Sequence, residues 1–233
     1  MKNTNFLKTK LIANRGIYNN KTIFENTLEA FNLAIEKELM IHLSVNITKD
    51  NILVVYHDHD LTRLTNLKDR VETLTYEELN YLSSFKIPTL EESLKLINGR
   101  VPIIINPRNY SNKYYLEKEL VKYLDDYQGL FAIVNKRATI IKWFNRHRPD
   151  YIIGEVLAKK AFNKRSIRDF MAHYAIITDF KSVNIRHYTP RKIKALKMNN
   201  MVLGYVADTQ EKYLQFKDVC DNLFIDNVED LEF

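Results

Sequence analysis

The sequence predicts an α/β fold, a (β/α)8 TIM barrel with a small insertion between its second and third strands. Short apolar runs alternate with helical patterns along the chain. Parallel strands joined by helices close naturally into a barrel, and 233 residues is a common length for one such domain. The candidate strands are residues 11–14, 41–45, 101–106, 130–135, 151–157, 182–185, 202–206 and 223–226.

The starts of the helices are marked by residues that cap a first turn. A Thr or Asn at the cap and an acid three residues later satisfy each other's backbone amides. Thr189 followed by Pro190 predicts a further helix start, and Gly99 predicts a helix end. The predicted capping pairs are Asn26 with Glu29, Thr75 with Glu78, and Thr89 with Glu92.

The segment of residues about 47–87 is too long for a simple loop between two barrel strands, so we expect it to form the insertion. The chain has 5 Gly and 5 Pro, and it shows no internal repeat, low-complexity segment or Gly- or Pro-rich linker. We therefore predict a single domain over residues 1–233.

Composition and charge are those of an ordinary globular protein. Hydrophobic residues make up 45% of the chain and charged residues 27%, which argues against disorder. The formal net charge of +6 comes from 35 Lys and Arg against 29 Asp and Glu. The basic residues are scattered and are not interleaved with aromatic residues in a binding motif. We expect a solvated basic surface and no nucleic-acid partner.

Cysteine usage and hydropathy bear on the compartment. Cys220 is the one cysteine, so neither an intramolecular disulfide nor a cysteine metal cluster is expected. Residues 1–10 lack the apolar core of a signal peptide, and no run approaches the roughly 18 apolar residues of a membrane span. The sequence therefore predicts a cytoplasmic protein without a membrane span.

The pattern of residues 41–58 indicates a possible site. A buried strand, a polar turn at residues 49–51 and a second β-rich run end in His57 and Asp58. A histidine in this position also fits an ordinary packing role. Because strand C-termini converge at one end of a barrel, we expect some of the polar residues near the predicted strand ends to share a pocket. These are Asn14, His42, Ser44, Asn106, Arg108, Asn135, Glu155 and Tyr205.

Together with residues 14–16 (Asn-Arg-Gly) and 25–27 (Glu-Asn-Thr), this stretch resembles the glycerophosphodiester phosphodiesterase family, whose frame reads His-Arg-Gly, Glu-Asn-Thr, Glu-x-Asp and His-Asp. The resemblance extends from residue 11 to about 227 and implies that the insertion carries its histidine over the barrel mouth. The matching positions are Arg15, Gly16, His57 and Asp58. The departures are Asn14 for the first catalytic His, His42 and Ser44 for two metal-binding carboxylates, Asn106 for a further acid, Arg108 for a lysine and Tyr205 for a Trp.

The resemblance implies hydrolysis of a glycerophosphodiester with a divalent cation, Mg²⁺ or Ca²⁺, and a pair of histidines. Such cations depend on anionic oxygen ligands, and His42, Ser44 and Asn106 supply none. Asn14 does not titrate, so His57 lacks its proton-transfer partner. We therefore expect no cofactor, impaired catalysis and binding of a phosphate-containing small molecule through Arg15 and Arg108.

Two other functions remain open at this point. The first is an active phosphoric diester hydrolase with a rearranged site, in which Glu25 or Glu155 supplies a ligand for the divalent cation. The second is a partner-binding barrel with a vestigial pocket. A Zn²⁺ site of His42, His57 and Asp58 is less favoured than ordinary polar lining. The sequence does not indicate an oligomeric state. The further pocket residues that we predict are Glu25, Asp58, Asn135, Glu155 and Tyr205.

Overall fold

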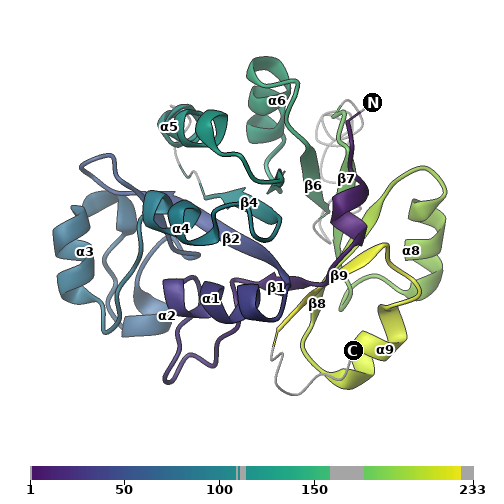
Figure 1. Ribbon diagram of the computed structural model, residues 1–233, viewed down its shortest axis with the longest axis horizontal. Coiled ribbons are helices and arrows are strands. Elements are labelled where there is room, and N and C mark those ends of the chain that lie inside the picture. The colour runs from purple at the N-terminus through teal and green to yellow at the C-terminus, as the bar shows by residue number, and fades with distance from the viewer. Residues whose placement is uncertain (1, 109, 111–113, 158–175, 227–233) are drawn as a thin grey trace. The chain divides into compact units, whose positions relative to one another are not determined.

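The computed structural model describes residues 2–108, 110, 114–157 and 176–226. Within them, strands lie at all the predicted positions, and a described helix separates each consecutive pair of these strands except β6 and β7, which confirms the predicted (β/α)8 barrel class (Figure 1). The corresponding strands are β1 (Ile12–Asn14), β2 (Met40–Ile47), β4 (Ile103–Pro107), β5 (Phe131–Asn135), β6 (Ile153–Leu157), β7 (Phe180–Asn184), β8 (Val202–Ala207) and β9 (Asn222–Ile225).

The chain divides into two compact units. One is Ala13–Leu130, the 13–130 unit, and the other is Met1–Ile12 together with Phe131–Phe233, the 131–233 unit.

In the 13–130 unit, β2 and β4 are parallel and place Ser44 opposite Asn106. Helices α1 (Leu28–Glu36) and α4 (Leu90–Ile97) pack against each other (Figure 1). The same unit contains α5 (Tyr115–Asp126). Both faces of β2 are buried, as expected for a parallel strand covered by helices.

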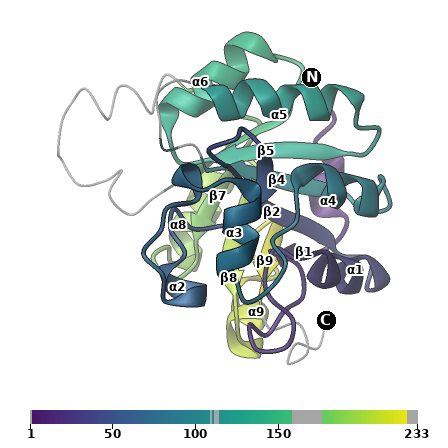
Figure 2. The same ribbon diagram turned by 90° about the vertical axis from the view of Figure 1, so that its left-hand side faces the viewer.

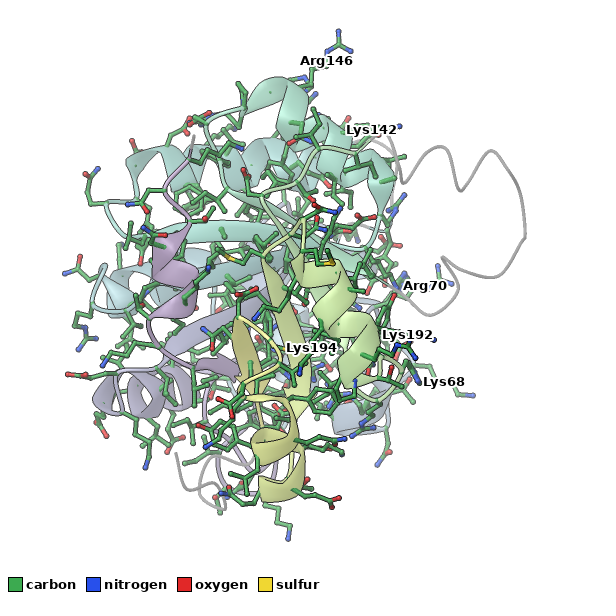
Figure 3. The ribbon with its side chains drawn as sticks, turned by 90° about the vertical axis from the view of Figure 1, so that its right-hand side faces the viewer. Lys68, Arg70, Lys142, Arg146, Lys192 and Lys194 are labelled. Carbon is green, nitrogen blue, oxygen red and sulfur yellow. The ribbon has the colours of Figure 1, made fainter. Side chains whose placement is uncertain are left out.

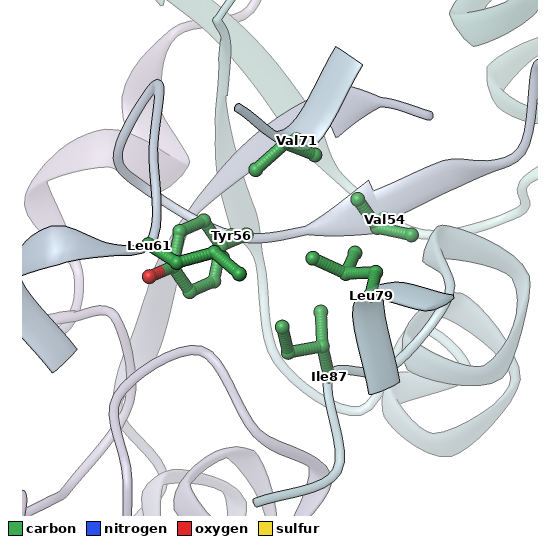
Figure 4. Close-up of a cluster of buried hydrophobic side chains, with 6 residues drawn as sticks. All are labelled: Val54, Tyr56, Leu61, Val71, Leu79 and Ile87. Carbon is green, nitrogen blue, oxygen red and sulfur yellow. The ribbon is translucent and has the colours of Figure 1, made fainter. Parts of the chain in front are cut away.

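The segment between β2 and β4 holds the insertion. It comprises β3 (Leu53–Val55), α2 (Thr62–Thr65), the 3-10 turn η2 (Val71–Thr73) and α3 (Tyr76–Leu82), and β3 pairs with β2 in antiparallel orientation. Apolar side chains from these elements form a buried cluster of their own (Figure 4). The insertion is therefore packed around a core and can hold the residues that follow β3 in place. The cluster residues are Val54, Tyr56, Leu61, Val71, Leu79 and Ile87.

In the 131–233 unit, consecutive strands from β5 to β9 pair in parallel, and Figure 2 shows β8 and β9 side by side. Helices α6 (Ala138–His147), α8 (Pro190–Lys197) and α9 (Gln210–Phe216) pack against these strands. The 3-10 turn η1 (Asn5–Lys8) belongs to the same unit. Asn222 at the start of β9 donates hydrogen bonds to the carbonyls of Leu7 and Lys10, which ties the N-terminal segment to this unit.

Helix α6 is a surface helix with one buried face. On α6, Ile140, Ile141 and Phe144 are buried, while Lys142 and Arg146 point away from the ribbon (Figure 3). Among the described residues, no helix has the length and apolarity needed to cross a membrane.

The predicted caps are confirmed at three helices and wrong at one. Capping boxes are present at the starts of α3 and α4, and Thr189 caps α8 with Pro190 in its first turn. At α1 the cap is Thr27, whose hydroxyl accepts from the amide of Ala30. Asn26 instead has a positive φ of 59°, and its side-chain oxygen accepts from the backbone amide of Ser44 at 3.3 Å.

Candidate functional site

A tight turn after β1 positions the first site residue, Arg15. Arg15 has a φ of 69° and Gly16 a φ of 85°. A Cβ on Gly16 would lie 2.8 Å from backbone atoms of Ala30, so this position requires glycine. The amide of Arg15 donates to the carbonyl of His42, and its carbonyl accepts from the amide of Asn26. These contacts fix the arginine beside β2.

Side chains of alternating residues on β2 provide the next part of the site. His42 and Ser44 lie two residues apart and therefore share one face of the strand. Both are buried, with exposed fractions of 8% and 0%. Asn106 lies opposite Ser44 on β4. Ser44 and Asn106 are therefore neighbours on β2 and β4, and a pocket shared by the predicted residues stays a prediction.

The His42 ring forms a buried hydrogen bond with Asn14, with 2.8 Å between Nδ1 and Oδ1. An amide oxygen accepts only, so His42 carries its proton on Nδ1. Burial lowers the pKa of His42 well below its usual range, and the charges of Arg15, His57 and Arg108 lower it further. His42 is therefore a neutral ring near pH 7, and the positive charges of Arg15 and Arg108 act on it.

The His57–Asp58 pair follows β3 and is held against β2 by Asn46. The Asn46 amide donates to the carbonyls of Tyr56 and Asp58 at 2.8 and 3.0 Å. His57 Nδ1 lies 2.7 Å from Asp58 Oδ1. A neutral His57 that donates to this carboxylate keeps Nε2 as its basic nitrogen. The pair is thus oriented as a base and its supporting acid.

The pKa values of this pair reflect their surroundings. Burial lowers the pKa of His57, its hydrogen bond to Asp58 opposes this, and the charges of Arg15 and Arg108 lower it again. Burial raises the pKa of Asp58, but the hydrogen bonds and charges of His57 and Arg63 bring it to about 2. Asp58 is therefore ionised and His57 is neutral near pH 7.

Arg63 of α2 connects the insertion to Glu25. Its Nη1 and Nη2 donate to the two oxygens of Glu25 at 2.9 and 2.6 Å, and its Nε donates to Asp58 at 2.7 Å. Glu25, which is 2% exposed, also accepts from Arg15 Nη1 at 2.8 Å. Burial raises the pKa of Glu25, but Arg63 and Arg15 outweigh this effect and lower it. Two guanidinium groups therefore neutralise one buried carboxylate.

Several buried polar atoms in this region have no hydrogen-bond partner among the described residues. They can all donate, and they come from the turn after β1, from the residues before α1, from β2 and from the residue that follows β4. Buried polar groups are normally paired, so such a group of atoms indicates a place for an acceptor. The atoms are Arg15 Nε, Asn26 Nδ2, Ser44 Oγ and Arg108 Nε. We call these four residues the anion pocket.

Arg108 follows β4 and is held from two sides. Its backbone amide donates to the carbonyl of Val45 at 2.7 Å, and its guanidinium lies 5.8 Å from the ring centroid of Tyr110. Tyr110 in turn meets His59 of the insertion edge to face. The arginine predicted at the end of this strand therefore has a supporting aromatic neighbour.

The other predicted pocket residues lie in the 131–233 unit. Asn135, 4% exposed, ends β5 and accepts from the amide of Arg137. Glu155 is neither of the alternatives considered from the sequence, an unmatched acid or an edge residue. It lies on β6 between β5 and β7 and pairs with Lys181 at 2.6 Å. Tyr205 of β8 shares a hydrogen bond with Asn184.

Sequence reasoning missed Arg63 and Asn46. Arg63 contacts a residue 38 positions away, and no periodicity reports such a contact. Its one signal was a charged residue within the apolar pattern of the insertion. Glu25 lies before α1, which begins at Leu28, and pairs with two arginines.

No three His, Cys, Asp or Glu residues within the described part of the chain are grouped as a metal site. The 13–130 unit also has a pocket of about 270 Å³, which is separate from the predicted site residues. Its lining includes Phe24 and Phe85, which stack with their ring centroids 4.2 Å apart. It contains none of the anion-pocket residues.

Two similar proteins match different shares of the chain. A glycerophosphodiester phosphodiesterase of Bacillus altitudinis is 39% identical over 109 residues, 42% of this chain and 44% of that protein. YhdW of Bacillus subtilis (strain 168) is 33% identical over 196 residues, 78% of this chain and 75% of that protein.

A solved structure has the same fold at low identity. It is a phosphodiesterase of Oleispira antarctica in complex with the product sn-glycerol-3-phosphate, with a TM-score of 0.77 and 17% identity over 93% of this chain and 92% of that one. The model of the glycerophosphoryl diester phosphodiesterase family matches residues 15–230. The chain therefore belongs to the glycerophosphoryl diester phosphodiesterase family.

Proposed function

We propose that this protein binds a phosphate-containing small molecule, a glycerophosphodiester or glycerol phosphate, in the anion pocket without a metal ion, and that its metal-dependent hydrolysis is impaired. The observation that carries the proposal is the set of unpaired buried donors in Arg15, Asn26, Ser44 and Arg108. A phosphate group presents acceptor oxygens that match such donors.

The local charge supports the same ligand. The guanidinium groups of Arg15, Arg63 and Arg108 accompany the two carboxylates of Glu25 and Asp58, so one positive charge is in excess when the histidines are neutral. Arg15 and Arg108 both lower the pKa of the neighbouring histidines, which means that their positive potential reaches the same region. A buried positive potential favours an anion over a cation.

A divalent cation does not fit these residues. The family uses such a cation, but here the resemblance assigns its ligand positions to His42, Ser44 and Asn106, which carry no negative charge. Glu25 and Asp58 are the nearby acids, and both are already bound by Arg63. A hard cation needs anionic oxygens, and a site with excess positive charge repels it. We therefore propose no step that passes through a metal ion.

Proton transfer is limited for the same reason. His57 has a base geometry, but Asn14 stands where the family has its other histidine, and its amide oxygen already accepts from His42. An amide neither takes up nor releases a proton in the physiological pH range. A pocket of this kind can hold and orient a phosphodiester without cleaving it efficiently.

Two further observations bear on the ligand and the compartment. The Oleispira relative binds sn-glycerol-3-phosphate, which motivates the choice of glycerol phosphates for this chain and a place in glycerol and lipid metabolism. Cys220 is a free, buried thiol whose pKa burial raises to about 12. A thiol of this kind suits a reducing cytoplasm.

Titration calorimetry of inorganic phosphate and sn-glycerol 3-phosphate, with EDTA present, tests the proposal. We expect binding by the parent protein and a loss of at least about tenfold in Arg15→Ala, because each charge-assisted contact contributes about 1.5–3 kcal/mol. Arg70→Ala is the matched control, since Arg70 lies exposed on the insertion and points into solvent (Figure 3). Equal affinity in Arg15→Ala and the parent would show that the pocket is vestigial.

An active hydrolase is the second candidate, and the oriented His57–Asp58 pair favours it. Release of glycerol 3-phosphate from a glycerophosphodiester, with Mg²⁺, Ca²⁺ or Mn²⁺ and then with a chelator, separates the two candidates. We expect no chelator-sensitive release above background. Robust release that a chelator abolishes would overturn the proposal of impaired catalysis and favour a rearranged metal site.

A further inference from the structure

We propose that Arg63 is a positioning residue of the anion pocket, which neutralises Glu25 so that the remaining donors of Arg15 stay available to the ligand. This inference rests on the proposed function and adds to it a residue outside the four of the anion pocket, which contacts Glu25 and Asp58. It assigns a role to the insertion, because Arg63 is part of α2.

The division of contacts around Glu25 is uneven. Arg63 takes both carboxylate oxygens in a two-point contact at 2.9 and 2.6 Å, whereas Arg15 gives Glu25 one hydrogen bond from Nη1 at 2.8 Å. Asn20 adds a weaker contact at 3.2 Å. The Nε of Arg15 remains buried without an acceptor among the described residues. The Glu25 carboxylate thus holds Arg15 in place but leaves its Nε donor unpaired.

Removal of Arg63 would change this division. Glu25 is 2% exposed and its charge must be neutralised locally, since an unpaired buried carboxylate is costly. Arg15 is the guanidinium already in contact with it and would turn to make the two-point contact. The excess positive charge of the cluster would also fall to zero. Both effects weaken anion binding.

The same guanidinium supports His57 indirectly. Its Nε donates to one oxygen of Asp58 at 2.7 Å, and the other oxygen of Asp58 lies 2.7 Å from His57 Nδ1. Arg63 therefore orients two of the groups that face the pocket, Arg15 through Glu25 and His57 through Asp58. A lysine has no planar fork, so it cannot make these three contacts at once.

A double-mutant cycle with inorganic phosphate as the probe tests this role. We expect phosphate affinity to fall at least about tenfold in Arg63→Gln and to rise in Glu25→Gln, because the carboxylate that competes for Arg15 is gone. The double variant Arg63→Gln/Glu25→Gln restores the net charge and should return to within about threefold of the parent. Arg63→Lys should be intermediate, and Arg70→Gln on the same insertion should bind as the parent does.

The recovery in the double variant distinguishes neutralisation from a general structural role. If Arg63 only held the insertion in place, the double variant would bind as weakly as Arg63→Gln, and the inference would be wrong. A crystal structure of Arg63→Gln gives a readout that does not need phosphate binding. We expect Arg15 in two-point contact with Glu25. If Arg15 instead keeps its single hydrogen bond to Glu25 in this variant, the inference about Arg63 is wrong, whether or not the parent protein binds phosphate. A parent protein that binds no phosphate would contradict only the proposed function.

Discussion

At the scale of single residues, the site is governed by the number of carboxylates and their partners. Glu25 and Asp58 are both ionised, and both are bound by guanidinium nitrogens at 2.6–2.9 Å. Because their charges are already neutralised by guanidinium groups, neither carboxylate should attract an additional cation strongly. The neighbouring polar positions on β2 and β4 add hydroxyl, amide and neutral imidazole groups. The region therefore offers donors to an anion and few charged ligands to a metal ion.

Restoring acidic residues should reverse this preference. The combined change Asn14→His, His42→Glu, Ser44→Asp and Asn106→Glu adds three carboxylates, so we expect Ca²⁺ or Mn²⁺ binding by calorimetry and weaker phosphate binding without metal. Catalytic turnover should return only if the contacts around the restored residues still hold them in the orientation that catalysis needs.

The control is Ser44→Asp alone, which should gain little, because cooperating groups are not additive. Circular dichroism checks that each variant folds. A folded fourfold variant that binds no divalent ion would contradict the assignment of these positions.

At the residue level, strand geometry places some of the predicted site residues beside one another. His42 and Ser44 share a face because they are two residues apart, and Asn106 lies opposite Ser44 because neighbouring parallel strands end together. Arg63 was out of reach of this reasoning. Its contact with Glu25 depends on how the insertion folds back, which is a tertiary property.

At the scale of the elements, strands and caps were predictable because their causes are local. Two of the three Thr or Asn capping pairs form as predicted, at α3 and α4. The third shifted by one residue, since Thr27 takes the cap and Asn26 adopts a positive φ that directs its side chain to Ser44. Asparagine tolerates a positive φ better than most residues, and here this conformation accompanies the hydrogen bond between Asn26 and Ser44.

The cap of α4 provides a quantitative prediction. The Thr89 hydroxyl accepts a hydrogen bond from the backbone amide of Glu92 at 3.0 Å, and the Glu92 carboxylate accepts one from the backbone amide of Thr89 at 2.8 Å. Thr89→Ala removes one half of this box, so we expect a loss of about 1 kcal/mol in the free energy of unfolding, measured by urea denaturation.

Ser84→Ala, an exposed loop position in the same unit, is the control and should change stability by less than about 0.5 kcal/mol. A loss in Thr89→Ala no larger than in this control would mean that solvent satisfies the helix end equally well.

At the scale of the whole molecule, the positions of the strands were predictable, whereas whether the 13–130 and 131–233 units unfold together was not. The sequence predicts one domain over residues 1–233, and we retain this as a proposal. The chain offers a way to test it, because the reporter and the titrating groups lie in different units. Trp143, the one tryptophan, is on α6, whereas His42 and His57 lie in the 13–130 unit.

The expected sign of the pH effect follows from the lowered pKa values of both histidines. Between their folded values and the unfolded value near 6.5, the unfolded chain binds more protons than the folded one. Stability is therefore fully present above about pH 7 and falls as the pH drops below about 6.5, by at most about 1.4 kcal/mol per pH unit for each histidine.

If the chain unfolds as one domain, the fluorescence of Trp143 should report this loss, although the titrating rings are in the other unit. We expect the urea midpoint from Trp143 to coincide with that from far-UV circular dichroism and to fall between pH 7.5 and pH 5. In His42→Asn/His57→Asn, which keeps amide donors but removes both titrations, the fall should be smaller. The two units would be shown to unfold separately by two results together. The urea midpoint from Trp143 would be unchanged by the double substitution, and circular dichroism would detect a transition at lower urea that the double substitution changes.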